Sequence, residues 1–347
     1  MAVHLPPPRV HAPGAGAPGP AAPGPASSPA RALRGTPARF ATAVRGAGVA
    51  GVVCVLVADA VAPAAVAGAG IAIALVGIVL GIPHGAVDHL VPFWAHGRRV
   101  QAGPLARGLA GYVATGAAAL AAVLLAPLPV TWLFLLVSAA HFGRGEVVVQ
   151  AELAGRRPPG PLHDALPAAA HGAVVVALPL ALHRDVSLRV LDRVAPGFAA
   201  TSGAVLDALV VATAVLVVAA LAALLAGRRP GEAAELALLA LLFVLVPATA
   251  AFGVYFGLWH AARHTLRLVL LPGADGQVPA VGAGLRRYAR GAALPSLAAV
   301  LLLWVVSATA NPSVLAAALV ALVALTAPHL VVVDALDRAV RPAAGTR

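Results

Sequence analysis

Residues 204–226 read AVLDALVVATAVLVVAALAALLA and carry one charged side chain, Asp207, before a Gly-Arg-Arg sequence at 227–229. A stretch of about 20 apolar residues is long enough to cross the hydrocarbon core of a bilayer as a helix, and a helix satisfies its own backbone hydrogen bonds there. Further apolar stretches, separated by Pro, Gly or Arg, surround this one. We therefore predict an all-α, polytopic integral membrane helical bundle of about ten transmembrane helices, within a range of eight to ten. The expected spans are residues 44–62, 66–84, 107–126, 129–144, 164–182, 204–226, 233–250, 252–271, 292–310 and 312–333.

The composition excludes an ordinary soluble enzyme. Of the 347 residues, 61% are hydrophobic and 11% are charged, and the mean hydropathy is +0.92, whereas soluble domains carry about 25% charged residues. The formal net charge is +11, but the arginines stand singly or in pairs between apolar stretches, so we do not expect nucleic-acid binding. Cys54 is the single cysteine, which excludes a disulfide framework and a cysteine-ligated metal site.

The distribution of arginine predicts the orientation in the membrane. Arginines precede the first span and follow the second, fourth, sixth, eighth and tenth, whereas the loops on the opposite side are short and mostly uncharged. Because positively charged loops stay cytoplasmic, ten spans place both termini in the cytoplasm, here of a bacterial plasma membrane. A single helix over 233–271, kinked at Pro247, is the alternative, and it breaks this alternation. Residues 1–43, rich in Pro, Ala and Gly, are expected to be a disordered tail, with a transmembrane domain over 44–335 and a cytoplasmic tail over 336–347.

Histidines inside or at the ends of these spans are the most informative polar residues, because ionisable side chains at membrane depth are costly and usually functional. His260 and His264 lie one helical turn apart in WHAARH, so their rings project from one helix face. The other candidates are His84 in GIPHGAVDH (81–89), His141 in SAAHFGRGE (138–146) and His329 in PHL (328–330). With the N-terminus inside, the four helices bring these histidines to the cytoplasmic leaflet.

A metal site explains this agreement in depth better than the alternative, in which neutral histidines hydrogen-bond neighbouring helices. Imidazole ligands without cysteine suit Fe, Zn, Cu or Ni. Neutral ligands leave a dication uncompensated, so carboxylates are expected beside them to orient the rings and supply charge. His171 is a candidate for burial in the fifth span, whereas His96, His163 and His183 resemble loop residues. The candidate carboxylates are Asp88, Glu146, Glu235 and Asp334, and Asp88 is placed to receive the second ring N–H of His84.

Five motifs, in order, resemble the Brp/Blh family of membrane β-carotene 15,15′-dioxygenases: GIPHGAVDH, AAHFGRGE, PAAAHGAVVVALPL, FGLWHAARH and TAPHLVVVD. The resemblance covers roughly residues 66–335. It implies that O2 cleaves the central double bond of β-carotene to give two molecules of all-trans-retinal, with a rhodopsin as the eventual acceptor of retinal. It also implies a non-haem Fe(2+) held by four histidines, which carry over onto His84, His141, His260 and His264. His329 lies in a recurrent family motif and is expected to support these four rather than to be a primary ligand.

Other functions fit the sequence less well. A membrane desaturase or hydroxylase needs more histidine boxes than the one HxxxH present, and a zinc-dependent intramembrane protease needs a Glu beside its paired histidines, where positions 261 and 262 are Ala. A haem-binding electron carrier would use histidines paired across helices. A non-enzymatic membrane transporter or chaperone for carotenoid or retinal is the main alternative, and cleavage of carotenoid by purified protein with Fe(II) and O2 distinguishes the two.

Overall fold

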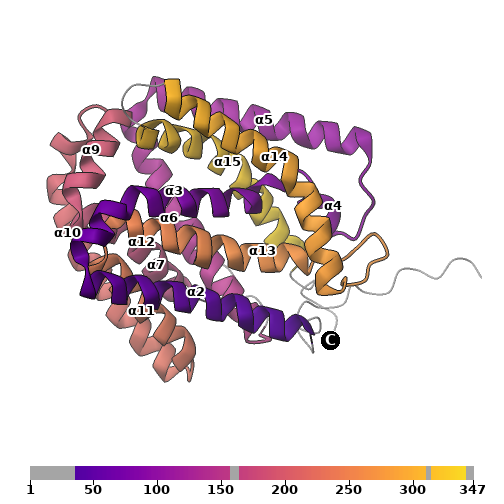
Figure 1. Ribbon diagram of the computed structural model, residues 1–347, viewed down its shortest axis with the longest axis horizontal. Coiled ribbons are helices and arrows are strands. Elements are labelled where there is room, and N and C mark those ends of the chain that lie inside the picture. Colours follow the sequence, from indigo (N-terminus) through magenta and orange to yellow (C-terminus); the bar gives the residue numbers. More distant parts are fainter. Residues whose placement is uncertain (1–35, 157–163, 310–313, 341–347) are drawn as a thin grey trace, which may run out of the picture.

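The computed structural model describes residues 36–156, 164–309 and 314–340. Every regular element within these ranges is a helix, and most of the long helices run side by side in one bundle (Figure 1). In chain order the elements are α2 (Thr36–Val61), α3 (Pro63–Ala86), α4 (Val91–Ala95), α5 (Ala102–Leu125), α6 (Pro127–Leu153), α7 (Ala165–Gly172), the π-helix η1 (Ala173–Ala177), α8 (Leu178–Leu182), α9 (Arg184–Val194), α10 (Phe198–Ala226), α11 (Pro230–Leu245), α12 (Ala248–Val254), the π-helix η2 (Tyr255–Ala261), α13 (Ala262–Val269), α14 (Val281–Thr309) and α15 (Val314–Val340).

The chain is a multi-pass membrane protein. Seven helical segments in the described residues are long and apolar enough to cross a bilayer, namely Pro37–Val61, Pro63–Ala86, Ala102–Leu125, Pro127–Leu153, Ala165–Leu182, Phe198–Ala226 and Ala316–Val340. Helices α11 to α14 occupy most of the described residues of the expected spans over 233–250, 252–271 and 292–310, with a break at 246–247, but these spans are not among the seven. One of them, α11, has only 16 residues. The all-α membrane fold is confirmed, while the count of ten stays a prediction.

The break at Pro247 is real. α11 ends at Leu245, Val246 adopts an extended backbone with ψ of 141°, and Pro247 precedes α12 with ψ of 134°. Residues 233–271 therefore do not form one kinked helix. This agrees with the alternation of arginines, which required two separate helices here. The next rod, formed by α12, η2 and α13, is continuous and carries the paired histidines.

Three boundaries differ from those expected. α2 begins at Thr36 and so includes residues 36–43, which the composition assigned to the tail; residues 1–35 lie outside the described part of the chain. α15 continues to Val340, and its Leu336 and Asp337 are buried, so 336–340 belong to the bundle. The short helix α9 occupies the loop expected over 183–203. Its Leu191 is buried, which explains why this charged segment folds onto the bundle.

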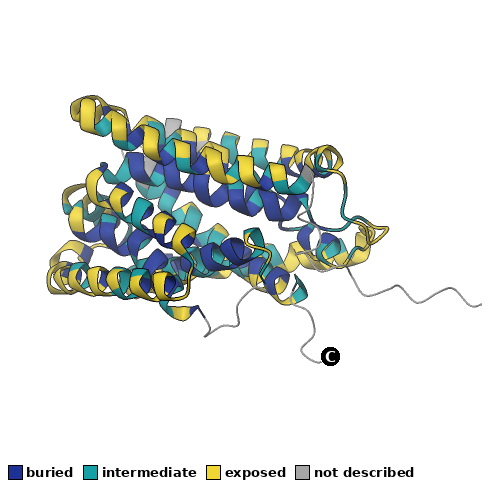
Figure 2. Ribbon diagram, turned by 90° about the horizontal axis from the view of Figure 1, so that it is seen from below, coloured by how far each residue is buried: buried dark blue, intermediate teal, exposed yellow. Residues whose placement is uncertain are grey.

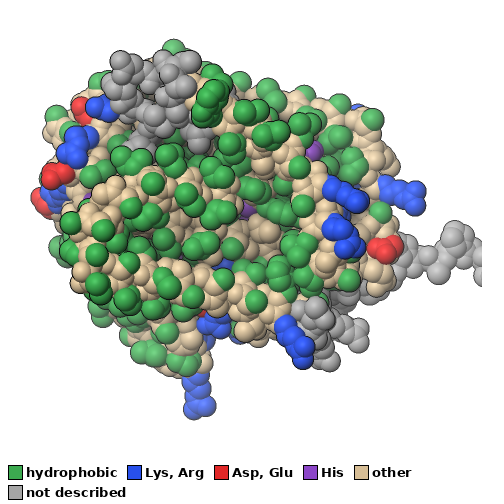
Figure 3. All heavy atoms as spheres, in the orientation of Figure 1, with side chains coloured by type: hydrophobic (Ala, Val, Ile, Leu, Met, Phe, Trp, Pro, Cys, Tyr) green, Lys and Arg blue, Asp and Glu red, His purple; other side chains and the backbone are tan. Residues whose placement is uncertain are grey.

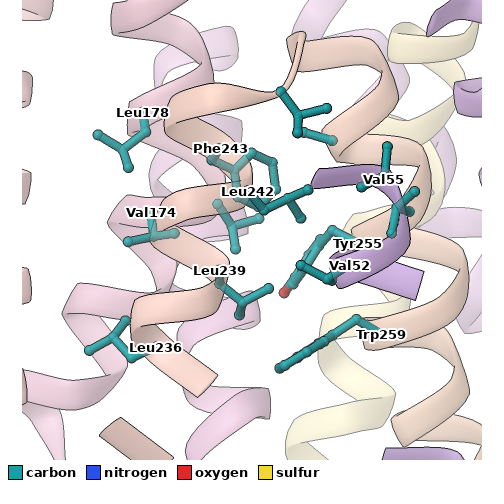
Figure 4. Packing of buried hydrophobic residues seen from close by; sticks show 14 of the residues in the cluster. Val52, Val55, Val174, Leu178, Leu236, Leu239, Leu242, Phe243, Tyr255 and Trp259 are labelled. Atoms are coloured by element: carbon teal, nitrogen blue, oxygen red, sulfur yellow. The ribbon is translucent and has the colours of Figure 1, made fainter. Parts of the chain in front are cut away.

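Buried residues face the interior of the bundle and exposed residues lie on its outside (Figure 2), and many of the exposed residues are large and hydrophobic. The largest interior cluster joins α2, η1, α8, α11 and η2 (Figure 4), and it includes Val52, Val174, Phe243 and Trp259. On the face shown in Figure 3, hydrophobic side chains cover the middle while charged side chains lie mainly toward the edges. An apolar exterior between charged ends is the arrangement that a lipid bilayer requires.

Glycines let two pairs of helices approach until their backbones touch, as is common in membrane bundles. A Cβ atom built on Gly77 of α3 would overlap the backbone of Gly253 in α12. In the same way, a Cβ atom on Gly143 of α6 would overlap the carbonyl of Ala168 in α7. The first contact places α3, which carries His84 in its last turn, directly beside the continuous helix that carries His260.

We expect Gly77→Ala to lower the free energy of unfolding by about 1–3 kcal/mol, because overpacking a closely packed contact forces backbone shifts. Gly68→Ala is the matched control on the same helix, since a Cβ atom there meets nothing within 4 Å and Ala favours a helix over Gly. Thermal unfolding in detergent measures both variants. Equal melting temperatures for the two would show that the α3–α12 contact is looser than described.

Candidate functional site

Five imidazole rings from five helical elements meet inside the bundle. They belong to His84 (α3), His141 (α6), His260 (η2), His264 (α13) and His329 (α15). Six pairs of these rings have centroids 5.1–5.6 Å apart, and all six pack edge to face. Four of the five side chains are buried and His141 is partly buried. The structure thus brings together the four histidines that the resemblance assigned to iron, and it adds His329.

The helices that carry the rings are locally irregular. His84 follows Pro83 in the last turn of α3, and its Nδ1–H donates a hydrogen bond to the carbonyl of Gly81. His260 lies in the π-helix η2, and His264 follows in α13. π-Helical segments widen a helix by one residue per turn and occur frequently at functional sites. The backbone is therefore irregular at two of the segments that carry the converging rings, near Pro83 and in η2.

His329 is fixed by two groups from other helices. Its Nδ1–H donates to Oδ2 of Asp88 at 2.8 Å, and the hydroxyl of Tyr112 in α5 donates to the same oxygen at 3.1 Å. Asp88 was expected to orient His84, four residues earlier, but the carbonyl of Gly81 already accepts the Nδ1–H of His84. The carboxylate is therefore free to pair with a histidine 241 residues away in the chain.

The other candidate carboxylates do not touch the five rings. Glu146 and Glu235 both accept hydrogen bonds from Gln150 and Arg263, and Glu146 also accepts from Trp259 Nε1 at 3.0 Å. Asp334 is exposed and pairs with Arg338. Helix geometry explains two of these placements, because a side chain five residues along an α-helix points about 140° away from the first. Glu146 follows His141 by five residues, and Asp334 follows His329 by five.

Buried ion pairs support the rod that carries His260 and His264. Arg263 is 1% exposed and lies between Glu146 and Glu235, with its guanidinium carbon 3.9 Å from the centre of the Trp259 ring. One turn later, Arg267 pairs with Glu152 at 2.8 Å and with Asp337 at 2.7 Å. These pairs link α6, α11 and α15 to α13, and so they hold the rod in a fixed rotation.

Sequence reasoning missed Tyr112, Arg263 and Arg267 as parts of the site. A signal was present for each of them. Tyr112 is a lone hydroxyl-bearing ring in the apolar stretch expected over 107–126, and the two arginines lie four residues apart inside an expected span. Polar side chains at such positions need partners from neighbouring helices.

An apolar cavity of about 730 Å³ borders the ring cluster. Its volume lies in the range typical of sites for small organic ligands. Four of the rings line it, those of His84, His141, His260 and His329, together with Asp88, Tyr112 and His89 at its polar part. Most of the remaining wall is apolar, and both π-helices contribute to it, η1 through Val175 and Val176 and η2 through Phe256. The cavity can therefore hold a hydrophobic molecule against the imidazoles.

Three other described histidines lie away from the cavity. His171 is buried in α7, as expected, and its Nδ1 bonds to the carbonyl of Pro167. His96 is exposed beside the carbonyl of Pro92, and His183 follows α8, with Nε2 3.3 Å from the carbonyl of Phe243. His163 lies outside the described residues. His96, His171 and His183 do not belong to the wall of the cavity.

The spacing of the five rings fits one imidazole-bound cation. Imidazoles that share an ion at nitrogen–metal distances of about 2.0–2.1 Å hold their ring centroids about 5 Å apart, close to the 5.1–5.6 Å found here. Within the described residues, no three His, Cys, Asp or Glu side chains already form a set that could hold a metal ion.

Comparison with known proteins gives two matches. The family described as beta-carotene 15,15′-dioxygenase matches residues 75–337, a range that contains all five clustered histidines. The probable beta-carotene 15,15′-dioxygenase Blh of Halobacterium salinarum is 34% identical over 299 residues, which cover 75% of this chain and 82% of that protein. No solved structure matches the chain. The family expected from the five motifs is confirmed: this chain belongs to the beta-carotene 15,15′-dioxygenase family.

Proposed function

We propose that this protein is a membrane dioxygenase that cleaves the central 15,15′ double bond of β-carotene with O2 and releases two molecules of all-trans-retinal. The observation that carries the proposal is the cluster of imidazoles on the wall of an apolar cavity, in a chain of this family. Both oxygen atoms and all carbon atoms are accounted for, since one C40 hydrocarbon and one O2 give two C20 aldehydes. No hydride donor is required.

Fe(2+) is the metal we propose, with His84, His141, His260 and His264 as its ligands. Imidazole suits iron, and the ring spacing supports one shared ion. When bound, the ferrous ion would supply the activation of O2. The carbonyl of Gly81, as acceptor from Nδ1 of His84, leaves Nε2 of that ring as the metal-binding nitrogen, because a neutral imidazole has one donor and one acceptor nitrogen.

The apolar walls would position the substrate. A carotenoid is a long, rigid hydrocarbon that dissolves in the bilayer, and a preformed apolar cavity orients such a molecule at little cost in entropy. Val176, Phe256 and Leu322 line the cavity from three elements. Their side chains exclude water from the double bond, which prevents side reactions of oxidised carbon.

The location that we propose is a bacterial plasma membrane, with both termini in the cytoplasm, on the basis of the arginine-rich loops. Retinal leaves by diffusion through the bilayer, and a rhodopsin is its proposed acceptor. This acceptor is inferred from the product alone.

A non-enzymatic carrier of carotenoid or retinal is the alternative that the apolar cavity also suits. Expression in a bacterium that makes β-carotene separates the two. The dioxygenase bleaches the cells and accumulates retinal, whereas a carrier leaves the cells coloured and co-purifies with intact carotenoid. Retained colour, with intact carotenoid bound to well-expressed protein, would favour the carrier.

A larger side chain on the cavity wall tests whether the substrate binds there. Ala299 of α14 lines the cavity, whereas the neighbouring Ala298 is exposed and does not. We expect Ala299→Trp to lower turnover of β-carotene by about 10- to 100-fold, because a displacement of about 1 Å at the reacting centre is enough for such a loss. Iron content should not change. Ala298→Trp should keep full turnover, and equal activities of the two variants would place the substrate elsewhere.

A further inference from the structure

His329 has an unused nitrogen among the other rings. Its Nε2 is buried and has no hydrogen-bond partner among the described residues, a property it shares with the Nε2 of His171. His171 lies away from the cavity, whereas the ring of His329 lies 5.1 Å from that of His84, 5.3 Å from that of His141 and 5.6 Å from that of His264. A buried polar atom without a partner costs free energy, so this nitrogen calls for a ligand.

The proton on this ring is placed by its neighbours. Oδ2 of Asp88 can only accept when the carboxylate is ionised, and it receives the Nδ1–H of His329 and the hydroxyl of Tyr112. In the neutral imidazole, the Nε2 atom of His329, across the ring from the bonded nitrogen, then carries a lone pair. A histidine whose second nitrogen donates to a carboxylate is the usual arrangement of a metal-bound imidazole.

The charge of Asp88 points the same way. This carboxylate is 2% exposed, its Oδ1 has no hydrogen-bond partner among the described residues, and the imidazole of His329 at its Oδ2 carries no charge when it is neutral. A buried carboxylate without a cation nearby is strongly unfavourable. A divalent ion among neutral imidazoles would compensate this charge, and the carboxylate would compensate the ion.

We propose that His329 is a fifth imidazole ligand, which binds the metal through Nε2, and that Asp88 and Tyr112 hold its ring and supply the balancing charge. This inference rests on the proposed function, in which a metal occupies the cluster. It assigns to His329 a direct bond, where the family resemblance gave it a supporting place. Asp88 and Tyr112 are positioning residues in this arrangement.

Metal binding to purified, metal-free protein tests the inference without any turnover. We would titrate the protein with Fe(II) under anaerobic conditions and record the absorption spectrum of the Co(II)-substituted form, which reports the number of ligands. His329→Gln keeps a donor for Asp88 but removes the imidazole lone pair. We expect it to weaken Fe(II) binding at least about 10- to 100-fold and to change the Co(II) spectrum.

Matched variants separate a ligand from a structural residue. Asp88→Asn should weaken binding by about 10- to 100-fold and Tyr112→Phe by less, both without the loss of a ligand in the Co(II) spectrum. His171→Ala removes the other buried histidine whose Nε2 has no hydrogen-bond partner among the described residues. It should change neither the Fe(II) affinity nor the Co(II) spectrum. Melting temperatures check that each variant is folded, and His329→Ala serves as a second variant.

Two results would overturn the inference. One is wild-type Fe(II) affinity with an unchanged Co(II) spectrum in His329→Gln, and the other is a wild-type protein that binds neither metal. The wild-type protein could bind Fe(II) but form no retinal, while His329→Gln loses Fe(II) binding. That pair of results would support the fifth ligand and contradict the proposed function. The two proposals therefore fail separately.

Discussion

Replacement of His260 or His264 by alanine is expected to lower retinal formation by about 10³-fold or more and to reduce bound iron in the same preparations. The two rings project from one continuous helical segment, His260 from η2 and His264 from α13. Their centroids lie 5.4 and 5.5 Å from the centroid of the His84 ring. A metal ion supplies several kcal/mol of stabilisation to a transition state, and each 1.36 kcal/mol is a factor of ten in rate. Iron analysis and retinal quantification on the same purified variants check the prediction.

The matched control is His96→Ala. His96 is exposed and lies outside the cavity, with its Nδ1 beside the carbonyl of Pro92, so its loss should leave iron content and turnover unchanged. The same assay applies to His84→Ala and His141→Ala, which should behave like the His260 variant. Full iron occupancy and full turnover in either His260→Ala or His264→Ala would end the four-histidine assignment.

The second large effect is expected at Arg263. Arg263→Met removes the buried cation that lies between Glu146 and Glu235. Glu146 loses this partner entirely, whereas Glu235 keeps its ion pair with Arg45. Breaking a buried ion pair by removal of one partner costs about 3–5 kcal/mol, so the variant should unfold at a clearly lower temperature and accumulate poorly. Unfolding in detergent, followed by loss of helical signal, measures the difference.

Two further variants isolate the charge as the cause. Glu146→Gln, added to Arg263→Met, neutralises a carboxylate that has lost the cation and should recover part of the lost stability. Glu235→Gln should recover less, because Arg45 still pairs with Glu235. Arg184→Met is the surface control, because Arg184 pairs with the exposed Asp207 and exposed pairs contribute about 0–1 kcal/mol. An Arg263→Met protein as stable as the wild type would show that this network does not stabilise the bundle.

The sequence predicted the membrane fold and the convergence of the histidines because both depend on local patterns. Hydrophobic length identifies spans, and the i,i+4 spacing of His260 and His264 places two rings on one face whatever surrounds them. Convergence of His84 and His141 followed from their common depth in the membrane. His329 also shared that depth, although its motif alone did not distinguish a ligand from a neighbour.

The partners of these rings could not be predicted because they lie on other helices. Asp88 meets His329 rather than His84, and this pairing depends on how α15 packs against the chain that follows α3. Glu146 and Asp334 were chosen by proximity in sequence, and helix rotation turns each away from its histidine. The π-helices η1 and η2 have no sequence signature comparable to a Pro or Gly break. The chain has 35 glycines, and the sequence alone does not show which of them packing requires. Gly77 is one of these.

The most direct test is the stoichiometry of cleavage by purified protein that contains a measured amount of iron. β-Carotene and O2 are supplied in detergent, and consumed carotenoid and all aldehydes are quantified with and without an Fe(II) chelator. We expect two molecules of all-trans-retinal for each β-carotene consumed, and loss of this activity when iron is removed. Iron-loaded, folded protein that binds β-carotene but forms no retinal, or that forms apocarotenals of unequal length, would contradict it.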